Sequence, residues 1–228
     1  MKGLFVTGTD TDAGKTVISE ALVHAFVMRG ERVAGLKPIS AGCEPTPAGL
    51  RNADALTLMR RANVVLPYAT VNPYAFAPPI APHIAAAEAG VEMDPDVIQG
   101  VVQAVGEQAD RVIVEGVGGW QVPIDDFVNT ADLAELLGLP VIMVVGLRVG
   151  ALNHALLTAE AIYQRAVPIG GWLVNVIDRD MTRIEENVLT LRRQIAFPYL
   201  GTVPWMDRPD VDSVVRHIDI DAIGSDRF

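Results

Sequence analysis

The feature that most constrains this sequence is a glycine-rich segment near its start, Gly8-Thr9-Asp10-Thr11-Asp12-Ala13-Gly14-Lys15-Thr16. It follows a short apolar run and leads into a helical pattern, which predicts a buried strand, a phosphate-binding loop and a helix. In such a loop, backbone N–H groups and the positive end of the helix dipole surround phosphate oxygens. Lys15 would reach the outer phosphates, and the Thr16 hydroxyl would ligate Mg²⁺. The segment therefore predicts a nucleoside triphosphate site.

The spacing within the phosphate-binding loop departs from the usual pattern. Five residues separate Gly8 from Gly14, whereas the common pattern has four residues between its glycines. A glycine turn before an ordinary core helix is the alternative interpretation, but a Gly-Lys-Thr triplet between a strand and a helix disfavours it. We therefore predict a variant branch of the nucleotide-binding families.

The apolar pattern of the whole chain alternates between short β-branched runs and longer stretches of helical period. This alternation is typical of an α/β fold whose uniformly apolar strands are covered on both faces. We predict a doubly wound, mainly parallel sheet of the P-loop nucleoside-triphosphate-binding kind, in a single domain spanning 1–228 with an acidic tail from about residue 207. The predicted strands are 3–7, 32–37, 111–115, 140–145, 171–176 and 199–203. The predicted helices are 15–29, 52–62, 82–89, 95–108, 130–137, 151–165 and 182–195.

Charge and cysteine content exclude several classes of protein. The net charge is −10, and the segment 80–135 carries eleven acidic residues against one basic residue. This acidity opposes binding to nucleic acids, whose affinity for proteins depends on Lys and Arg. The single Cys43 excludes a disulfide scaffold. The apolar stretch 136–147 is shorter than the roughly 20 residues that cross a bilayer, so we expect a cytoplasmic protein without a membrane partner.

Two charged residues end predicted strands and would lie near the phosphate-binding loop. Glu115 ends the strand 111–115, and Lys37 ends the strand 32–37. Ligands of doubly wound sheets bind at the carboxyl ends of the strands. A carboxylate there suits Mg²⁺, and a second ammonium group would stabilise charge on a transferring phosphoryl group. Taken alone, either residue could also be a solvated strand end.

Besides the loop, seven short blocks follow one another along the chain: Lys37-Pro38, Arg51-Asn52-Ala53-Asp54, Asn72-Pro73-Tyr74, Pro82-His83, Glu115-Gly116, Asn153-His154 and Pro204-Trp205. The loop and these blocks, in this order, resemble the dethiobiotin synthetase family. The resemblance implies an ATP- and Mg²⁺-dependent cyclo-ligase that forms the ureido ring of dethiobiotin from 7,8-diaminononanoate and CO₂ in biotin biosynthesis. The implied route passes through a carbamate and a carbamic–phosphoric anhydride.

The resemblance also implies roles for individual residues. The implied catalytic residues are Lys37 and Lys15, and the implied Mg²⁺ ligands are Thr16, Asp54 and Glu115. The implied ATP contacts are Asp12, Ala13, Gly14, Lys15, Thr16, Val17, Asp54, Glu115, Gly116, Val117 and Gly118, with Asn175, Val203, Pro204 and Trp205 around the adenine. The implied substrate contacts are Thr11, Lys37 and Ala41, and, from the second subunit of a homodimer, Gly150, Ala151, Leu152 and Asn153. These last four would bind the substrate carboxylate at a helix N-terminus.

Three of these assignments keep an alternative interpretation. Asp54 could be an ordinary acidic residue in the first turn of a helix, and Trp205 could be a core residue. Asn175 and Asp178 have the spacing of guanine recognition in many GTPases, but the lysine usually found between them is absent. ATP is therefore favoured over GTP.

The chain departs from the family's pattern beside the substrate. Position 41 tends to carry a hydroxyl residue in the family, whereas this chain has Ala41 after Ser40. Either Ser40 replaces that hydroxyl or backbone groups suffice, since one neutral hydrogen bond contributes only about 0.5–1.5 kcal/mol. Asp12 stands where a Glu is frequent, and we assign it no catalytic role. His154 is better explained as a structural histidine, and Cys43 as a bystander.

A nucleotide-dependent switch, such as a partition or maturation ATPase, is the main alternative function. It would share the loop and the sheet, but such switches tend to carry a further lysine where this chain has Thr9, and they act on a macromolecular partner. An amide-forming ligase of the cobalamin type is disfavoured because it would usually bring a glutaminase domain. ATP turnover that depends on the diamine and bicarbonate would separate the synthetase from the switch.

Overall fold

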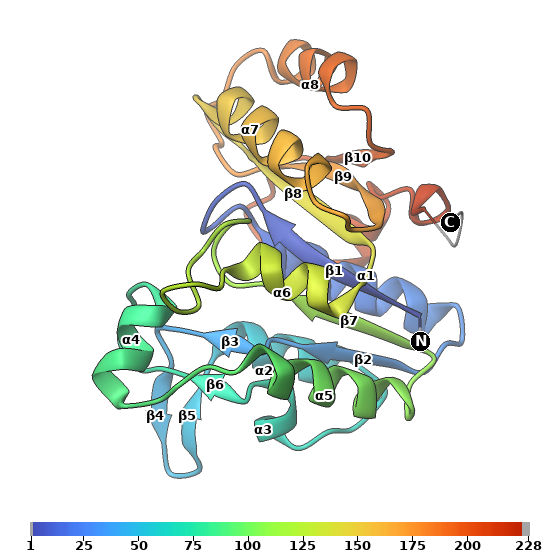
Figure 1. Ribbon diagram of the computed structural model, residues 1–228. Helices are drawn as coiled ribbons and strands as arrows, with labels where there is room; N and C mark the ends of the chain where they lie inside the picture. The colour runs from blue at the N-terminus through green and yellow to red at the C-terminus, as the bar shows by residue number, and fades with distance from the viewer. Residues whose placement is uncertain (1, 225–228) are drawn as a thin grey trace.

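The computed structural model describes residues 2–224, and within them a six-stranded sheet forms the centre of the molecule (Figure 1). Its strands are β1 (Lys2–Gly8), β2 (Val33–Leu36), β7 (Arg111–Glu115), β8 (Val141–Leu147), β9 (Ile169–Val176) and β10 (Tyr199–Val203). They lie in the order β10-β9-β8-β1-β7-β2, and every neighbouring pair is parallel. The predicted doubly wound parallel sheet is therefore confirmed.

Helices cover both faces of this sheet, which explains why its strands are apolar along their whole length. One core cluster packs α1 (Lys15–Met28) and α9 (Val211–Val215) against the sheet. The other cluster involves α5 (Pro95–Gly106), α6 (Thr130–Leu137), α7 (Ala151–Tyr163) and α8 (Ile184–Gln194). All seven residues of β8 and all four of β2 are buried. Each fully buried aliphatic side chain contributes roughly 1.5–3 kcal/mol.

All of the predicted helices and strands are present, with ends that differ from the prediction by two residues or fewer. The remaining predicted helices are α2 (Ala53–Arg61) and α4 (Pro82–Ala89). Local signals account for this agreement. Pro82 and Pro95 occupy the first turns of their helices, and Asn129 with Asp132 forms a capping box at the start of α6. Pro at the first position and an Asn cap both satisfy or avoid free N–H groups at a helix start.

The segment between β2 and α4 contains elements that the sequence did not predict. They are β3 (Ile39–Ser40), β4 (Glu44–Thr46), β5 (Gly49–Arg51), α3 (Tyr68–Val71) and β6 (Tyr74–Ala75). Each has four residues or fewer, so none has the length over which apolar periodicity becomes visible. The antiparallel pair β4–β5 is mostly exposed and contains Pro45 and Gly49.

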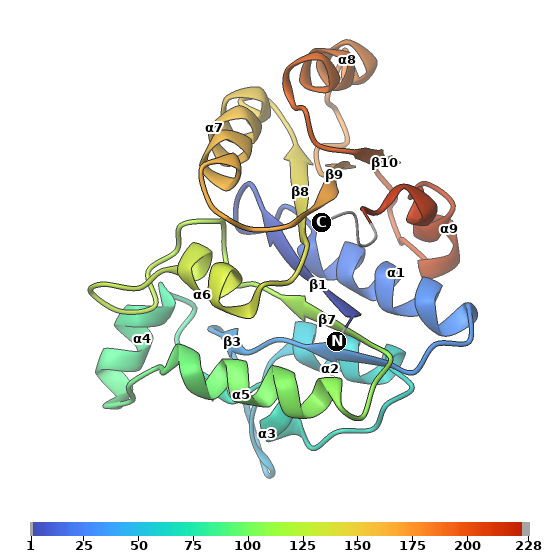
Figure 2. The same cartoon turned by 45° about the vertical axis from the view of Figure 1, so that its right-hand side comes forward.

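The segment after β10, in which the sequence predicted an acidic tail, packs against α1. Figure 2 shows α9 beside α1. Val214, Ile218 and Ile223 are buried in the same core cluster as α1, and a 3₁₀ turn, η1 (Ile220–Ala222), follows α9. The acidic residues of this segment face outward, and one of them, Asp210, caps α9. The tail is therefore structured as far as residue 224, and 225–228 lie outside the described residues.

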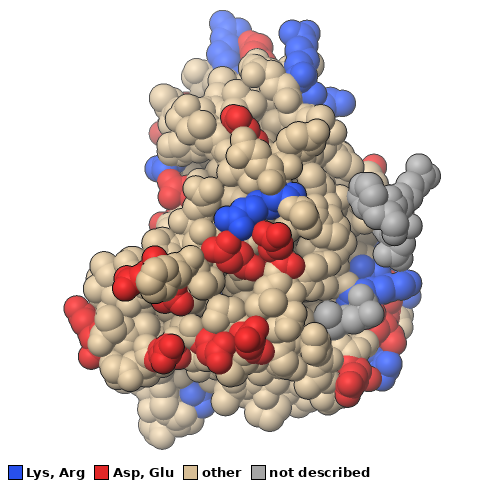
Figure 3. All heavy atoms as spheres, in the orientation of Figure 1, with Lys and Arg blue, Asp and Glu red and all other residues tan. Residues whose placement is uncertain are grey.

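The surface agrees with the charge distribution of the sequence. Figure 3 shows acidic side chains over the part of the surface formed by α4, α5 and α6, and basic side chains at the end formed by α8. In the part of the chain that the structure describes, no helix combines the length and the apolar character needed to cross a membrane.

Candidate active site

The phosphate-binding loop connects the end of β1 to the start of α1. Gly14 caps α1 with a φ of 89°, a conformation that favours glycine, and no side chain bonds to the first N–H groups of the helix. A side chain at Gly14 would also collide with the amide of Asn175. The uncapped N–H groups and the helix dipole can therefore bind an anion. The Nζ of Lys15 donates to the carbonyl oxygen of Asp10 at 2.9 Å, which holds the lysine across the loop.

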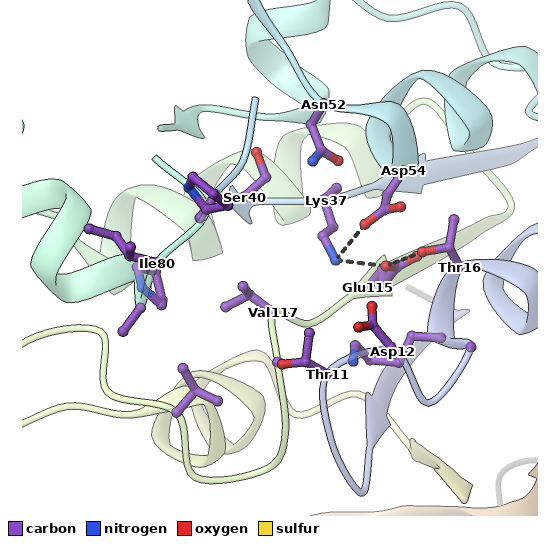
Figure 4. Close-up of a pocket in the computed structure, with 18 residues that line it drawn as sticks. Thr11, Asp12, Thr16, Lys37, Ser40, Asn52, Asp54, Ile80, Glu115 and Val117 are labelled. Carbon is purple, nitrogen blue, oxygen red and sulfur yellow. Dashed lines mark hydrogen bonds and ion pairs between the residues drawn. The ribbon is translucent and has the colours of Figure 1, made fainter. Parts of the chain in front are cut away.

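Glu115 lies at the centre of a group of charges beside this loop (Figure 4). Its Oε1 accepts two hydrogen bonds, from Thr16 Oγ1 at 2.8 Å and from Lys37 Nζ at 2.7 Å. Its Oε2 is buried and has no hydrogen-bond partner among the described residues. A buried carboxylate oxygen without a partner is costly, and Mg²⁺ prefers oxygen ligands of this kind. The donor set of Glu115, Thr16 and the nearby Asp54 therefore fits a magnesium ion.

Lys37 is buried at the carboxyl end of β2, with its side chain 5% exposed. Its Nζ donates to Glu115 Oε1 and to the carbonyl oxygen of Gly116 at 2.9 Å, and lies 3.4 Å from Asp54 Oδ2. Burial alone would lower the pKa of Lys37, but the carboxylates of Glu115 and Asp54 outweigh it and raise that pKa. Lys37 is therefore a fixed positive charge at neutral pH.

Burial has the opposite net effect on Lys15. Desolvation, assisted by the neighbouring charge of Lys37, lowers the pKa of Lys15 to about 8, despite the nearby carboxylates. Two ammonium groups in one place repel each other, so an anion placed between Lys15 and Lys37 would relieve the repulsion. The site is thus prepared for a polyanion.

The position of Asp54 is compatible with both interpretations that the sequence left open, and its implied role as a metal ligand stays a prediction. It lies in the first turn of α2, where the helix dipole favours an acid, and Asn52 caps this helix by accepting from Ala55 N at 3.1 Å. Its side chain also faces Lys37, as Figure 4 shows, and is 39% exposed. The carboxylate is therefore accessible to a ligand while still paired with the ammonium group.

These groups line a cavity of about 790 Å³. The predicted residues that line it are Thr11, Asp12, Gly14, Lys15, Thr16, Lys37, Ala41, Asp54, Glu115, Val117 and Gly118. Ser40, the candidate replacement for a hydroxyl at position 41, also lines it, together with Asn52 and Val122, which had no predicted role. An apolar wall, Pro79–Pro82, was not predicted, and Figure 4 shows its Ile80 across the cavity from Lys37 and Glu115. The cavity thus joins a charged end to an apolar end.

The predicted adenine contacts lie outside this cavity. Asn175, at the carboxyl end of β9, donates from Nδ2 to the carbonyl oxygen of Ala13 at 3.1 Å. Val203 is buried at the end of β10, and Pro204 and Trp205 follow it on the surface. Trp205 is 36% exposed, so this residue does not belong to the core. Of these residues, Asn175 contacts the loop, and Val203 is its register partner in β10.

The structure places the other predicted residues as follows. Gly150, Ala151, Leu152 and Asn153 form the start of α7 and do not line the cavity of the same chain. Ala13 is buried in the loop, Val17 lies in the first turn of α1, and Gly116 directly follows β7. His154 is exposed rather than packed. Ser40 lines the cavity, but its Oγ donates to Asn72 Oδ1 at 2.7 Å, so its proton is not free to replace a hydroxyl at position 41.

Comparison with known proteins gives the family. The sequence matches the family described as "AAA domain" over residues 2–212. It is 48% identical to the ATP-dependent dethiobiotin synthetase BioD of Pseudomonas aeruginosa strain UCBPP-PA14, over 98% of this chain and 99% of that protein. The protein of the same name from Ralstonia nicotianae is 49% identical over 95% of this chain and 94% of that protein.

Among solved structures, the fold is similar to that of nucleotide-binding ATPases. The septum site-determining protein MinD of Pyrococcus horikoshii, complexed with Mg-ADP, has a TM-score of 0.60 at 13% identity, over 97% of this chain and 88% of that chain. A ParA family ATPase from Chlorobium tepidum has a TM-score of 0.57 at 14% identity, over 96% of this chain and 91% of that chain. These likenesses confirm the predicted fold, and the sequence identities place the chain more narrowly. The chain belongs to the dethiobiotin synthetase family.

Proposed function

We propose that this protein is an ATP- and Mg²⁺-dependent cyclo-ligase that forms dethiobiotin from 7,8-diaminononanoate and CO₂. Family membership supports the overall reaction, because the relatives are named for it. The observation that carries the proposal is the meeting of Lys37 and Glu115 with the phosphate-binding loop at one cavity. A reaction that joins an anionic carbamate to a triphosphate needs such a gathering of positive charge.

The two lysines would lower the barrier to phosphoryl transfer. A substrate amine captures CO₂ as a carbamate, whose oxygen attacks the γ-phosphate and releases ADP. Both partners are negatively charged, and the ammonium groups of Lys15 and Lys37 would offset their repulsion. The second amine then attacks the carbonyl carbon of the carbamic–phosphoric anhydride, closes the ring and expels phosphate. Lys37 is well suited to this role because three oxygens already hold its Nζ in place.

Thr16, Asp54 and Glu115 would hold the magnesium ion, which would supply Lewis-acid stabilisation of the phosphate charge. The unpartnered Oε2 of Glu115 supports this assignment. The Thr16 hydroxyl donates its proton in the hydrogen bond to Glu115 Oε1, so the lone pairs of its oxygen remain available to a cation.

Asn175, Val203, Pro204 and Trp205 would bind the adenine. Because the Nδ2 group of Asn175 is bonded to the carbonyl oxygen of Ala13, the amide presents its Oδ1 as an acceptor. An acceptor complements the exocyclic amino group of adenine, whereas guanine has a carbonyl oxygen at the same ring position. This orientation favours ATP over GTP, as the sequence also predicted.

The substrate would lie between the charged end and the apolar wall of the cavity, contacting Thr11, Lys37 and Ala41. Its carboxylate would bind the N–H groups at the start of α7, contributed by the second subunit of a homodimer. One observation supports this arrangement: Gly150–Asn153 do not line the cavity of their own chain, so another copy would have to present them to the substrate.

The proposal is tested by incubating the purified protein with 7,8-diaminononanoate, bicarbonate, Mg²⁺ and ATP, and searching for the cyclic urea by mass spectrometry. We expect ADP release to depend on the diamine and on bicarbonate. Lys37→Ala should abolish the product while leaving ATP binding largely intact. ATP turnover that ignores the diamine but responds to DNA or to a protein partner would instead favour the switch ATPase.

A further inference from the structure

Asn72 follows α3 and is 2% exposed, and nothing in the proposed reaction uses it. All four hydrogen-bonding positions of its side-chain amide are occupied. Nδ2 donates to the carbonyl oxygens of Lys37 at 2.6 Å and Tyr74 at 3.3 Å. Oδ1 accepts from Ser40 Oγ at 2.7 Å and from Tyr68 Oη at 2.8 Å. A fully bonded, buried amide has one orientation and little freedom to move.

The first set of hydrogen bonds around Asn72 holds the backbone of Lys37. β2 ends at Leu36, whose register partner in β7 is Val114, so the sheet no longer pairs Lys37 with a neighbouring strand. The N–H of Lys37 instead donates to Val71 O at 2.9 Å, and its carbonyl oxygen accepts from Asn72. Val71 and Asn72 therefore hydrogen-bond both backbone polar groups of Lys37.

The second set of hydrogen bonds connects Asn72 to the start of α2. The hydroxyl of Tyr68 donates to Asn72 Oδ1 and accepts from the backbone N–H of Asn52 at 2.7 Å. Asn52 caps α2, and Asp54 lies two residues further on, facing Lys37. The side-chain amide of Asn72 therefore fixes the backbone of Lys37. Through the Tyr68 hydroxyl it also fixes the backbone of Asn52, close to Asp54.

We propose that Asn72 is a positioning residue, which sets the Lys37 ammonium group in register with Glu115 and Asp54 for the reaction. The inference rests on the proposed function, because its consequence is a change in phosphoryl transfer. Errors of about 1 Å in the position of a catalytic group cost on the order of 100-fold in rate. Residues that orient metal ligands by hydrogen bonds typically cost about 10- to 100-fold when they are lost, and we expect the same scale for a lysine held by its backbone.

The chain offers a matched control for this residue. Asn63 clamps the opposite end of β2 in a similar way, since its Oδ1 accepts from Val33 N at 2.7 Å and its Nδ2 donates to Glu31 O at 2.9 Å. We expect Asn72→Ala to lower kcat for diamine-dependent ADP release by about 10- to 100-fold, with KM for ATP changed less than about threefold. Asn63→Ala should leave kcat within about twofold of the parent protein.

Two further measurements separate positioning from a general loss of structure. Tyr68→Phe keeps the ring, over which the Arg51 guanidinium lies at 4.1 Å, and removes only the hydroxyl bridge. It should lower kcat by roughly three- to tenfold, with a fall in melting temperature of only about 1–6 °C, because a single net hydrogen bond contributes little to stability. In a Lys37→Arg background, Asn72→Ala should add less than about threefold, because the effects of coupled residues are not additive.

A crystal structure of Asn72→Ala tests the positioning without reference to turnover. We expect Lys37 Nζ to leave its contact with Glu115 Oε1. An unmoved Lys37, a kcat equal to that of Asn63→Ala, or full multiplication of effects in the Lys37→Arg background would overturn the inference. Absence of diamine-dependent ADP release by the parent protein would instead refute the proposed function, while a displaced Lys37 would still support the positioning.

Discussion

The buried pair of Lys37 and Glu115 makes a strong prediction about stability. Its side chains are 5% and 0% exposed, so each charge is largely shielded from water when its partner is removed, although both side chains lie in the wall of the cavity. Breaking a buried pair from one side costs about 3–5 kcal/mol, whereas replacing both partners with apolar residues is often neutral. We therefore compare Lys37→Met, Glu115→Leu and the double variant.

The remaining contacts of each partner set the expected magnitudes. In Glu115→Leu, the ammonium group keeps Gly116 O and Asp54, and losing its proton at pH 7 would cost at most about 4.6 kcal/mol. We expect a destabilisation of about 3 kcal/mol. In Lys37→Met, the carboxylate keeps only Thr16, and we expect about 3–4 kcal/mol. The double variant should lie within about 1 kcal/mol of the parent protein, although all three lose product formation.

The assay is urea unfolding at pH 7, with EDTA and without nucleotide, because ligands that bind the folded state raise the apparent stability. For a chain of this size, 3 kcal/mol corresponds to a fall in melting temperature of roughly 6–12 °C. A double variant as unstable as the two single variants combined would refute the argument, since it would show that the losses come from packing. A loss below about 1 kcal/mol in either single variant would equally show that water reaches the pair.

Further predictions concern glycine conformation, a helix cap and the C-terminal segment. Gly14→Ala should weaken ATP binding at least tenfold by calorimetry, because the φ of Gly14 is positive and Asn175 occupies the space that a Cβ would need. As the control, Gly30→Ala should cost only about 1 kcal/mol of stability, because Gly30 has a φ of 84° but open space around it. Burial alone would raise the pKa of Asp132, but hydrogen bonds from the start of α6 and from Arg165 lower it. Its stabilising effect is therefore present above the unfolded pKa of about 3.9 and is lost as the pH falls through the lower pKa of the folded state. Asp132→Asn should cost about 1 kcal/mol in urea unfolding at pH 7 and progressively less as the pH is lowered below about 3.9. Ile218→Ala should cost about 2–4 kcal/mol in the same assay, because this side chain is 7% exposed in the core beside α1.

The sequence was sufficient to predict the main sheet and its helices because their signals are local and repeated. Strands such as 141–147 are buried along their whole length, and helices such as α6 carry their own caps. The short elements between β2 and α4 have no such signals, because their backbone is ordered by contacts such as Tyr74 N with Pro38 O and Phe76 N with Ser40 O. The apolar wall of the cavity comes from this region and was missed for the same reason.

The candidate site was predicted where it follows from chain order. A loop after β1, a lysine after β2 and a glutamate at the end of β7 meet because carboxyl ends of parallel strands share one edge. The network around Asn72 could not be predicted, because it depends on how Tyr68 and Ser40 return to that edge through irregular chain. A sequence block such as Asn72-Pro73-Tyr74 indicates that the segment has a structural role, but it does not show which groups the Asn72 side chain bonds.

The hydrogen bonds of the site also indicate how a metal ion would enter it. Thr16 and Lys37 both donate to the same oxygen of Glu115, which leaves Oε2 and the lone pairs of the threonine as acceptors without a competing donor. Among the described residues, no group of three His, Cys, Asp or Glu side chains is placed to hold a metal, and two ammonium groups lie close by. The protein alone therefore provides few ligands and an unfavourable charge for a divalent cation. Both deficits disappear when a triphosphate is present, because its oxygens add ligands and its charge outweighs the lysines, so the arrangement suits a magnesium ion that arrives with ATP.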